Sequence, residues 1–288
     1  MTAAERIGVA AQIACLLEAS AAKPGNVHPG APFADARYED FLLSGAAIGP
    51  AMAAAGEASV GAVIRRAVRA TRHTVRANTN LGIVLLLAPL AKAAATLDPR
   101  DAEHDDARCP ALRDAIRRVL DGLDVEDARE AYAAIREAAP GGLGSAEAQD
   151  VAGEPTVTLR EAMALAAERD SVAREYVTDY ALTFERTVPA LERARRAGLI
   201  WPDAVVQAYL EVLAAAPDTL VARKRGREVA EQVSREARRA VEAGGMHSDT
   251  GRQTIAELDR AWRDEANTKN PGTTADLIAA GLFVLWWT

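Results

Sequence analysis

Apolar positions along the chain recur mostly at the spacing of amphipathic helices. Nowhere do apolar and polar residues alternate as they do in a half-buried strand. The sequence therefore predicts an all-α fold. No shift in composition marks a boundary, so residues 1–288 are expected to form a single domain whose polar and glycine-rich loops form one cleft. The expected helices cover about residues 4–21, 38–55, 60–77, 109–121, 125–138, 158–168, 172–197, 203–216, 226–243, 250–266 and 273–287.

Two segments depart from the amphipathic pattern because they are almost wholly apolar. One begins at Leu81 after the polar turn 78–80, and the other begins at Leu277 after the polar turn 270–276. Helices this apolar must be buried, so their first N–H groups point into the protein or into a cleft. These groups carry partial positive charge and suit a phosphate. An alternative for the second turn is a capping box from Thr273 to Asp276 that only closes a core helix.

Composition excludes several classes of partner. The net charge is −7, whereas a nucleic-acid-binding domain normally carries a basic excess. Both apolar segments are shorter than the roughly 20 residues that span a bilayer, so no membrane is expected. The N-terminus does not read as a signal peptide. Cys15 and Cys109 have no metal or redox spacing, and reduced thiols in a cytoplasmic protein are the expectation.

Three loops between the helices have compositions that suit the binding of a ligand or a metal. Residues 23–32 contain three prolines and two glycines, which forbid regular structure. Residues 139–150 contain three glycines in close succession, typical of close backbone approach to a ligand or of an ordinary linker. The segment 217–226 pairs an acid with Arg and Lys, so it is either a metal and phosphate site or a charged surface turn.

A row of arginines marks the helix expected at 60–77. Arg65, Arg69, Arg72 and Arg76 recur every three or four residues and share one face. This face is either solvated or forms a cationic wall beside the turn 78–80, which follows the helix directly.

Five short motifs, in this order, resemble the triphosphoribosyl-dephospho-CoA synthase family over residues ~15 to 285. Each motif alone is weak, but their order and spacing together are specific. They are Glu18 with Lys23-Pro24-Gly25, Asn78-Thr79 with Gly82, Gly141-Gly142 with Glu147, Asp218 with Arg223 and Gly226, and Asn270-Pro271-Gly272 with Ala275-Asp276-Leu277.

The resemblance implies an all-helical transferase that uses ATP as donor. Adenine leaves the ribose, and the 2′-hydroxyl of 3′-dephospho-CoA takes its place. The partners are thus small molecules, and Mg²⁺ is the expected cofactor because the triphosphate is retained. The candidate catalytic residues are Glu18, Glu147 and Asp276; those for nucleotide and phosphate are Lys23, Asn26, Asn78, Thr79, Asn80, Gly82, Arg223, Lys224 and Asn270; those for metal are Asp150 and Asp218. Which carboxylate is acid, base or metal ligand stays open, as does the oligomeric state.

The chain also departs from the family pattern. Asn80 and Leu81 stand where the family carries His and Lys, and the Gly-Gly segment lacks an Arg before Glu147. These differences indicate a divergent branch. Two alternatives follow: a related ribosyl or phosphoribosyl transferase with another acceptor, for instance in C1-carrier pterin cofactor synthesis, and a non-catalytic nucleotide-binding protein.

Overall fold

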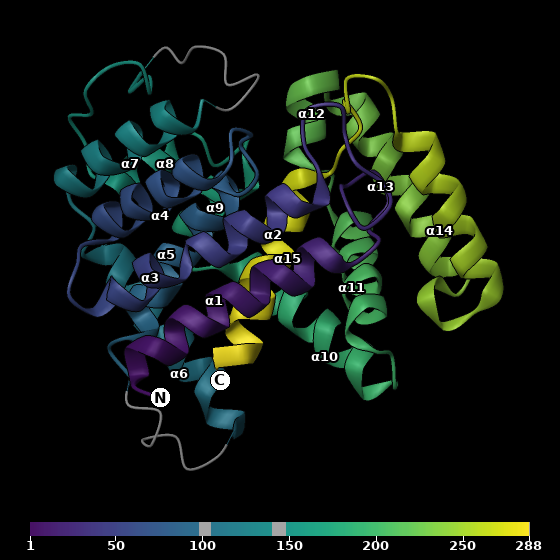
Figure 1. Ribbon diagram of the computed structural model, residues 1–288, viewed down its shortest axis with the longest axis horizontal. Coiled ribbons are helices and arrows are strands. Elements are labelled where there is room, and N and C mark those ends of the chain that lie inside the picture. The colour runs from purple at the N-terminus through teal and green to yellow at the C-terminus, as the bar shows by residue number, and fades with distance from the viewer. Residues whose placement is uncertain (98–104, 140–147, 288) are drawn as a thin grey trace.

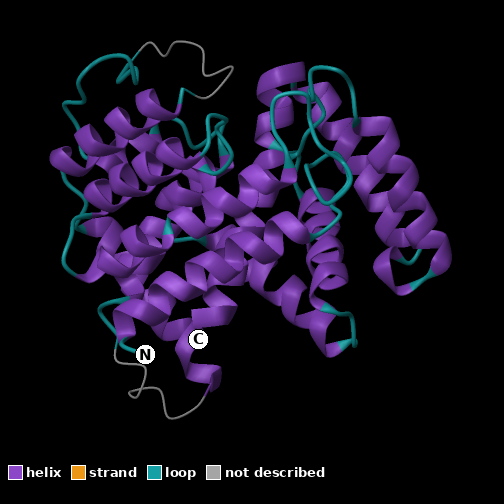
Figure 2. Ribbon diagram, in the orientation of Figure 1, coloured by secondary structure: helices purple, strands orange, loops and turns teal. Residues whose placement is uncertain are grey.

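A computed structural model describes residues 1–97, 105–139 and 148–287 of the chain. In these ranges every element is a helix, and the single β-bridge joins His28 and Ala31 (Figure 2). The all-α prediction is confirmed. The helices are α1 (Ala3–Ser20), α2 (Tyr38–Ala47), α3 (Gly49–Ala53), α4 (Val60–Thr74), α5 (Leu81–Ala94), α6 (Asp105–Asp121), α7 (Val125–Ala138), α8 (Leu159–Ala164), α9 (Ser171–Val177), α10 (Val188–Arg196), α11 (Trp201–Ala215), α12 (Thr219–Arg225), α13 (Arg227–Glu242), α14 (Asp249–Trp262) and α15 (Gly272–Trp287).

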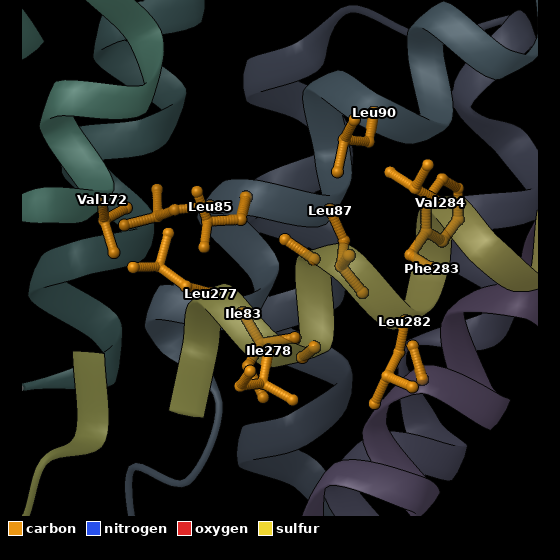
Figure 3. Packing of buried hydrophobic residues seen from close by; sticks show 14 of the residues in the cluster. Ile83, Leu85, Leu87, Leu90, Val172, Leu277, Ile278, Leu282, Phe283 and Val284 are labelled. Carbon is orange, nitrogen blue, oxygen red and sulfur yellow. The ribbon is translucent and has the colours of Figure 1, made fainter. Parts of the chain in front are cut away.

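The last helix, α15, runs through the middle of the molecule (Figure 1). It contacts α1, α5, α10 and α11, so elements from both ends of the chain meet on it. The apolar faces of α5 and α15 pack directly together, with Leu85 against Leu277 and Ile83 against Ile278 (Figure 3). These are the two apolar segments of the sequence, and both are buried as predicted.

A proline inside α5 is accommodated by two tyrosines. Pro89 has no N–H, so the carbonyl of Leu85 loses its partner within the helix. The Tyr176 hydroxyl donates to that carbonyl at 2.6 Å, and the Tyr180 hydroxyl donates to the carbonyl of Leu86 at 2.8 Å. Both tyrosines are fully buried. The end of α9 and the residues just after it therefore support the helix that leads out of the turn 78–80.

Tyr176→Phe is expected to lower the free energy of unfolding by about 1–3 kcal/mol, because it leaves the Leu85 carbonyl buried without a donor. Denaturant unfolding measures this change. Tyr38→Phe is the matched control, since the Tyr38 hydroxyl bonds the Ser20 hydroxyl in a part-buried place. An equal loss in both variants would contradict the role given to Tyr176.

Several helix ends shift by a few residues from the predicted ones, and three differences change the order of the elements. The segment 217–226 was expected as a turn but contains α12, whose first turn Asp218 caps. The helix expected at 172–197 breaks between α9 and a π-turn at Thr183–Thr187, because Asp179 and Tyr180 adopt positive φ. The helix expected at 38–55 divides at Ile48, just before Pro50.

Among the described helices, none alone combines the length and apolarity needed to cross a membrane. The bent pair α11 and α12, which meet at 59°, would meet that requirement together by length and composition.

Candidate ligand-binding cleft

The structure contains a cleft of about 1290 Å³. Its walls come from the loop after α1, the turn before α5, the α8–α9 connection, α12 and the turn before α15. The volume exceeds the roughly 300–1,000 Å³ typical of a pocket for one small ligand. For the polar loops that the structure describes, the prediction that they form one cleft is confirmed; the glycine-rich residues 140–147 lie outside the described residues.

Most of the predicted site residues line this cleft: Glu18, Asn26, Asn78, Thr79, Asn80, Gly82, Asp150, Arg223, Lys224, Asn270 and Asp276. Lys23 and Asp218 do not line it. Glu147 lies outside the described residues. The position of a residue in the wall does not test its role, so the individual roles stay predictions.

The turn before α5 is held by hydrogen bonds on each of its three polar side chains. Asn78 Oδ1 accepts the N–H of the first residue of α5 at 3.3 Å. The Thr79 hydroxyl bonds the hydroxyl of Ser44, and Asn80 Oδ1 accepts from the Thr71 hydroxyl at 3.1 Å. The start of α5 thus reaches the cleft with a fixed backbone, as the anion-binding interpretation requires.

The start of α15 is capped from another helix. Asp218 Oδ2 accepts both the backbone N–H and the hydroxyl of Thr274, each at 2.7 Å. Asp218 Oδ1 accepts the N–H groups of Leu220 and Val221 at 2.8 and 3.0 Å. One buried carboxylate therefore ties α12 to α15. The capping box within 273–276 is not formed, because α15 already begins at Gly272 and Asp218 supplies the cap.

The hydrogen bonds of Asp218 leave its carboxylate little capacity to bind a metal. Its four hydrogen bonds take the roughly four lone-pair sites of a carboxylate. Metal ligation by Asp218 stays untested, but it would require breaking at least one cap.

Asp218→Asn is expected to destabilise the protein by about 1–3 kcal/mol, because the amide nitrogen cannot accept the bonds that its oxygen accepted. The variant is also expected to bind Mg-ATP about tenfold more weakly if Asp218 ligates the metal directly. Thermal melting and titration calorimetry separate the two roles. Lower stability with unchanged affinity would leave Asp218 as a cap alone.

Lys23 is fully buried and forms an ion pair with Glu18. Its Nζ lies 2.9 Å from Glu18 Oε1 and also donates to the carbonyls of Glu18 and Ala21. An ammonium has three donors, so all of them are used and none faces a phosphate. In this conformation Lys23 holds the Glu18 carboxylate at the cleft wall, and its binding to a phosphate stays a prediction.

Asp276 stands in the first turn of α15 and faces the first turn of α5. Among the described residues none donates a hydrogen bond to its carboxyl. Burial, together with the charges of Glu18 and Asp218, raises the pKa of Asp276 well above its ordinary value. A Cβ on Gly82 would lie 2.0 Å from Asp276 Oδ2, so only glycine leaves room for this carboxyl. The raised pKa shifts Asp276 towards its protonated form.

Two cations and an amide line the same cleft as this carboxyl. Arg223 of α12 lies 3.8 Å from Asp170, and Lys224 donates to the carbonyl of Asn267 at 3.1 Å. Asn270 Oδ1 is buried without a hydrogen-bond partner in the described part of the chain. Asp170 was missed in the sequence, although an Asp before the short apolar helix α9 is a recognisable N-cap signal.

The arginine row on α4 has two functions. Arg65 and Arg69 pair with Glu130 and Glu137 of α7 at 2.9 and 3.1 Å, which fastens the two helices together. Arg76, after the end of α4, lines the cleft. The cationic wall is therefore limited to the last member of the row.

The fold and the cleft define an all-α protein in which two helix N-termini, acids and cations line one cleft. The chain belongs to the CitG family, ATP:dephospho-CoA triphosphoribosyl transferase, whose model matches residues 4–287. The family resemblance predicted from the motifs is thus confirmed.

Individual relatives agree with the family. A Pseudomonas syringae pv. tomato protein is 35% identical over 97 residues, which cover 34% of this chain and 33% of the relative. A Pseudomonas aeruginosa protein is 37% identical over 107 residues, which cover 36% of each. Both are provisionally assigned as 2-(5''-triphosphoribosyl)-3'-dephosphocoenzyme-A synthases. The matched part spans about a third of the length of these curated relatives.

A solved structure matches far more of the chain. The protein from Archaeoglobus fulgidus, provisionally assigned as a triphosphoribosyl-dephospho-CoA synthase, superposes with a TM-score of 0.62 at 27% identity. The match covers 84% of this chain and 96% of that one.

Proposed function

We propose that this protein transfers the triphosphoribosyl group of ATP to the 2′-hydroxyl of 3′-dephospho-CoA and releases adenine. The observation that carries the proposal is the cleft, in which Glu18 and Asp276 lie beside the N-termini of α5 and α15. The family match over residues 4–287 supports the same reaction.

The proposed reaction exchanges one bond at the anomeric carbon. The bond from C1′ of the ATP ribose to adenine breaks, and a bond from C1′ to the 2′-oxygen of dephospho-CoA forms. Adenine leaves with a proton, and the attacking hydroxyl loses one. The transition state is expected to resemble an oxocarbenium ion, which a nearby carboxylate stabilises.

The two carboxyls suit these two proton movements. Asp276 favours its protonated form, so it is the candidate that gives a proton to departing adenine. Glu18 is paired with the buried Lys23, so it is the candidate that stabilises positive charge or accepts the hydroxyl proton.

The triphosphate must be held without being cleaved. The N–H groups at the starts of α5 and α15 that Asn78 and Asp218 leave uncapped suit its oxygens. Arg223 and Lys224 bring positive charge to the same cleft, and the unpartnered amide oxygen of Asn270 can accept from a ribose hydroxyl.

A magnesium ion fits these residues in part. In the described ranges no three acidic, histidine or cysteine side chains gather closely enough to form a metal site. Asp150 lines the cleft, whereas Asp218 is fully engaged as a cap. Of the two predicted ligands, Asp150 is the better placed, and phosphate oxygens would supply most of the others. When bound, Mg²⁺ would neutralise charge on the triphosphate.

Adenine release tests the proposal. The purified protein is incubated with Mg-ATP and dephospho-CoA, and free adenine and the mass of the product are measured. Equal amounts of adenine and triphosphoribosyl-dephospho-CoA are expected. Absence of both, with Mg-ATP binding intact, would reject this reaction.

A related transferase with another acceptor is the second candidate. Asn80 and Leu81 stand where the family carries His and Lys, and the Asn80 side chain bonds Thr71 and Ser44. The turn before α5 therefore offers the ligands fewer ionisable side chains than the family pattern does. Adenine release that requires a different ribose-bearing acceptor would favour this candidate.

A further inference from the structure

The loop that joins α1 to α2 is fastened to α14, a helix that contributes no side chain to the cleft. Asp259 of α14 accepts the backbone N–H of Gly25 through Oδ1 at 2.9 Å. Its other oxygen lies 3.4 Å from Nε2 of His28. One carboxylate thus fixes the loop at a backbone amide and at a side chain three residues apart.

Arg263 fixes the same loop at two more points. Its guanidinium donates to the carbonyl of Asn26 and, at 3.3 Å, to the carbonyl of Ala31. It also lies 5.8 Å from the ring centroid of Phe33. Arg263 and Asp259 are 2.9 Å apart in an ion pair, so they act as one unit.

The fastened loop forms part of the cleft wall. Asn26, Phe33 and Asp35 all line the cleft. The Asn26 amide donates to the hydroxyl of the fully buried Tyr209 at 2.9 Å, which orients it further. In Figure 1 this loop lies on the same side of the molecule as α12, α13 and α14.

We propose that Asp259 and Arg263 are positioning residues, which hold the loop 24–36 as a wall of the cleft so that Asn26 and Phe33 meet the substrates. Neither residue touches the cleft, and neither belongs to the motifs that carry the family resemblance. The kinetic part of this inference rests on the proposed function, whereas the structural part does not.

The pair is charged throughout the neutral range. Burial opposes the charge, but hydrogen bonds from His28, Arg263 and Gly25 outweigh it and lower the pKa of Asp259 to about 2. An acid with a lowered pKa stabilises the fold above its unfolded pKa of about 3.9, and this contribution is lost as the pH falls through about 2. Near neutral pH the Asp259 carboxylate therefore stays charged and keeps its bonds to the loop 24–36.

Asp259→Asn, Arg263→Gln and the double variant test the proposal, with Arg252→Gln as matched control. Arg252 also belongs to α14 and pairs with Asp203 of α11 at 2.6 Å, but it makes no contact with the loop. Hydrogen exchange of residues 24–36, melting temperature, Mg-ATP affinity and the steady-state constants are measured for each.

We expect faster exchange confined to the loop and a fall in kcat/KM of at least about tenfold relative to Arg252→Gln, because small displacements of cleft residues are costly. The double variant should be no worse than the poorer single one, since the two residues act together. Arg263→Lys should recover part of the loss, because the ammonium keeps the positive charge and can still donate to a loop carbonyl.

Two results would overturn the proposal. One is loop exchange equal to that of the control. The other is faster exchange with unchanged kinetics and unchanged Mg-ATP affinity. If the wild type releases no adenine, the proposed function fails instead, and exchange together with Mg-ATP calorimetry still decides whether the pair positions the loop.

Discussion

Asp276→Asn is expected to give a folded protein whose turnover falls at least a hundredfold, roughly 2.7 kcal/mol in the activation barrier. The amide keeps the shape of the carboxyl but cannot give up a proton to departing adenine. Because no described residue donates to Asp276, the substitution breaks no hydrogen bond of the fold. The measurement pairs a melting curve with adenine release under saturating Mg-ATP.

The pH dependence of stability provides a control that does not require activity. A carboxyl whose folded pKa is raised stabilises the fold fully below its unfolded pKa of about 3.9, and that contribution is lost as the pH rises through the folded pKa. Wild type should therefore lose more stability than Asp276→Asn between acidic and alkaline pH. Normal turnover in the variant, with a lowered melting point, would reduce Asp276 to a structural residue.

The pH profile of turnover should follow the same group. If the protonated form of Asp276 acts, turnover falls as the pH rises through its folded pKa. A rate that instead increases steadily with pH would indicate that Asp276 acts as a carboxylate.

The sequence predicted the central elements because their pattern is strong. An apolar run such as 81–94 has no stable position except a buried helix, and the polar turn before it marks its start. The turn before α15 was found for the same reason. Both turns line the cleft, so their shared site could be inferred from local chemistry alone.

Side-chain contacts with residues that are distant in the sequence could not be predicted. Asp218 was expected to bind metal because it precedes Arg223 and Lys224, but its carboxylate faces Thr274, a residue remote in sequence. Lys23 was expected to bind phosphate, and its burial follows from the way α1 ends beneath the cleft.

The role of the Asp259–Arg263 pair could not be predicted from the sequence either. At 259 and 263 the sequence reads as an ordinary i,i+4 ion pair on a helix. Its contact with a loop more than two hundred residues earlier exists only in the fold.

Gly82→Ala is the second substitution expected to have a large effect, and it tests how α5 and α15 share the site. Alanine is the better helix former by about 1 kcal/mol, so α5 itself should tolerate the change. The added Cβ would lie 2.0 Å from Asp276 Oδ2, so the carboxyl must move. We expect turnover to fall at least about a hundredfold, as for a misplaced catalytic group. Gly122→Ala is the control, because its Cβ would meet nothing nearer than 3.5 Å.

A double-variant cycle decides why Gly82→Ala fails. If the methyl group acts by displacing Asp276, then adding Gly82→Ala to Asp276→Asn should lower turnover little further, and Mg-ATP affinity should be kept. If Gly82 instead takes part in phosphate binding, as the sequence predicted, and a phosphate approaches its backbone closely, Mg-ATP affinity should fall in both backgrounds. Calorimetry and adenine release on the four proteins separate these outcomes. Wild-type turnover in Gly82→Ala would contradict both, because it would mean that the cleft accepts a methyl group between the first turns of α5 and α15.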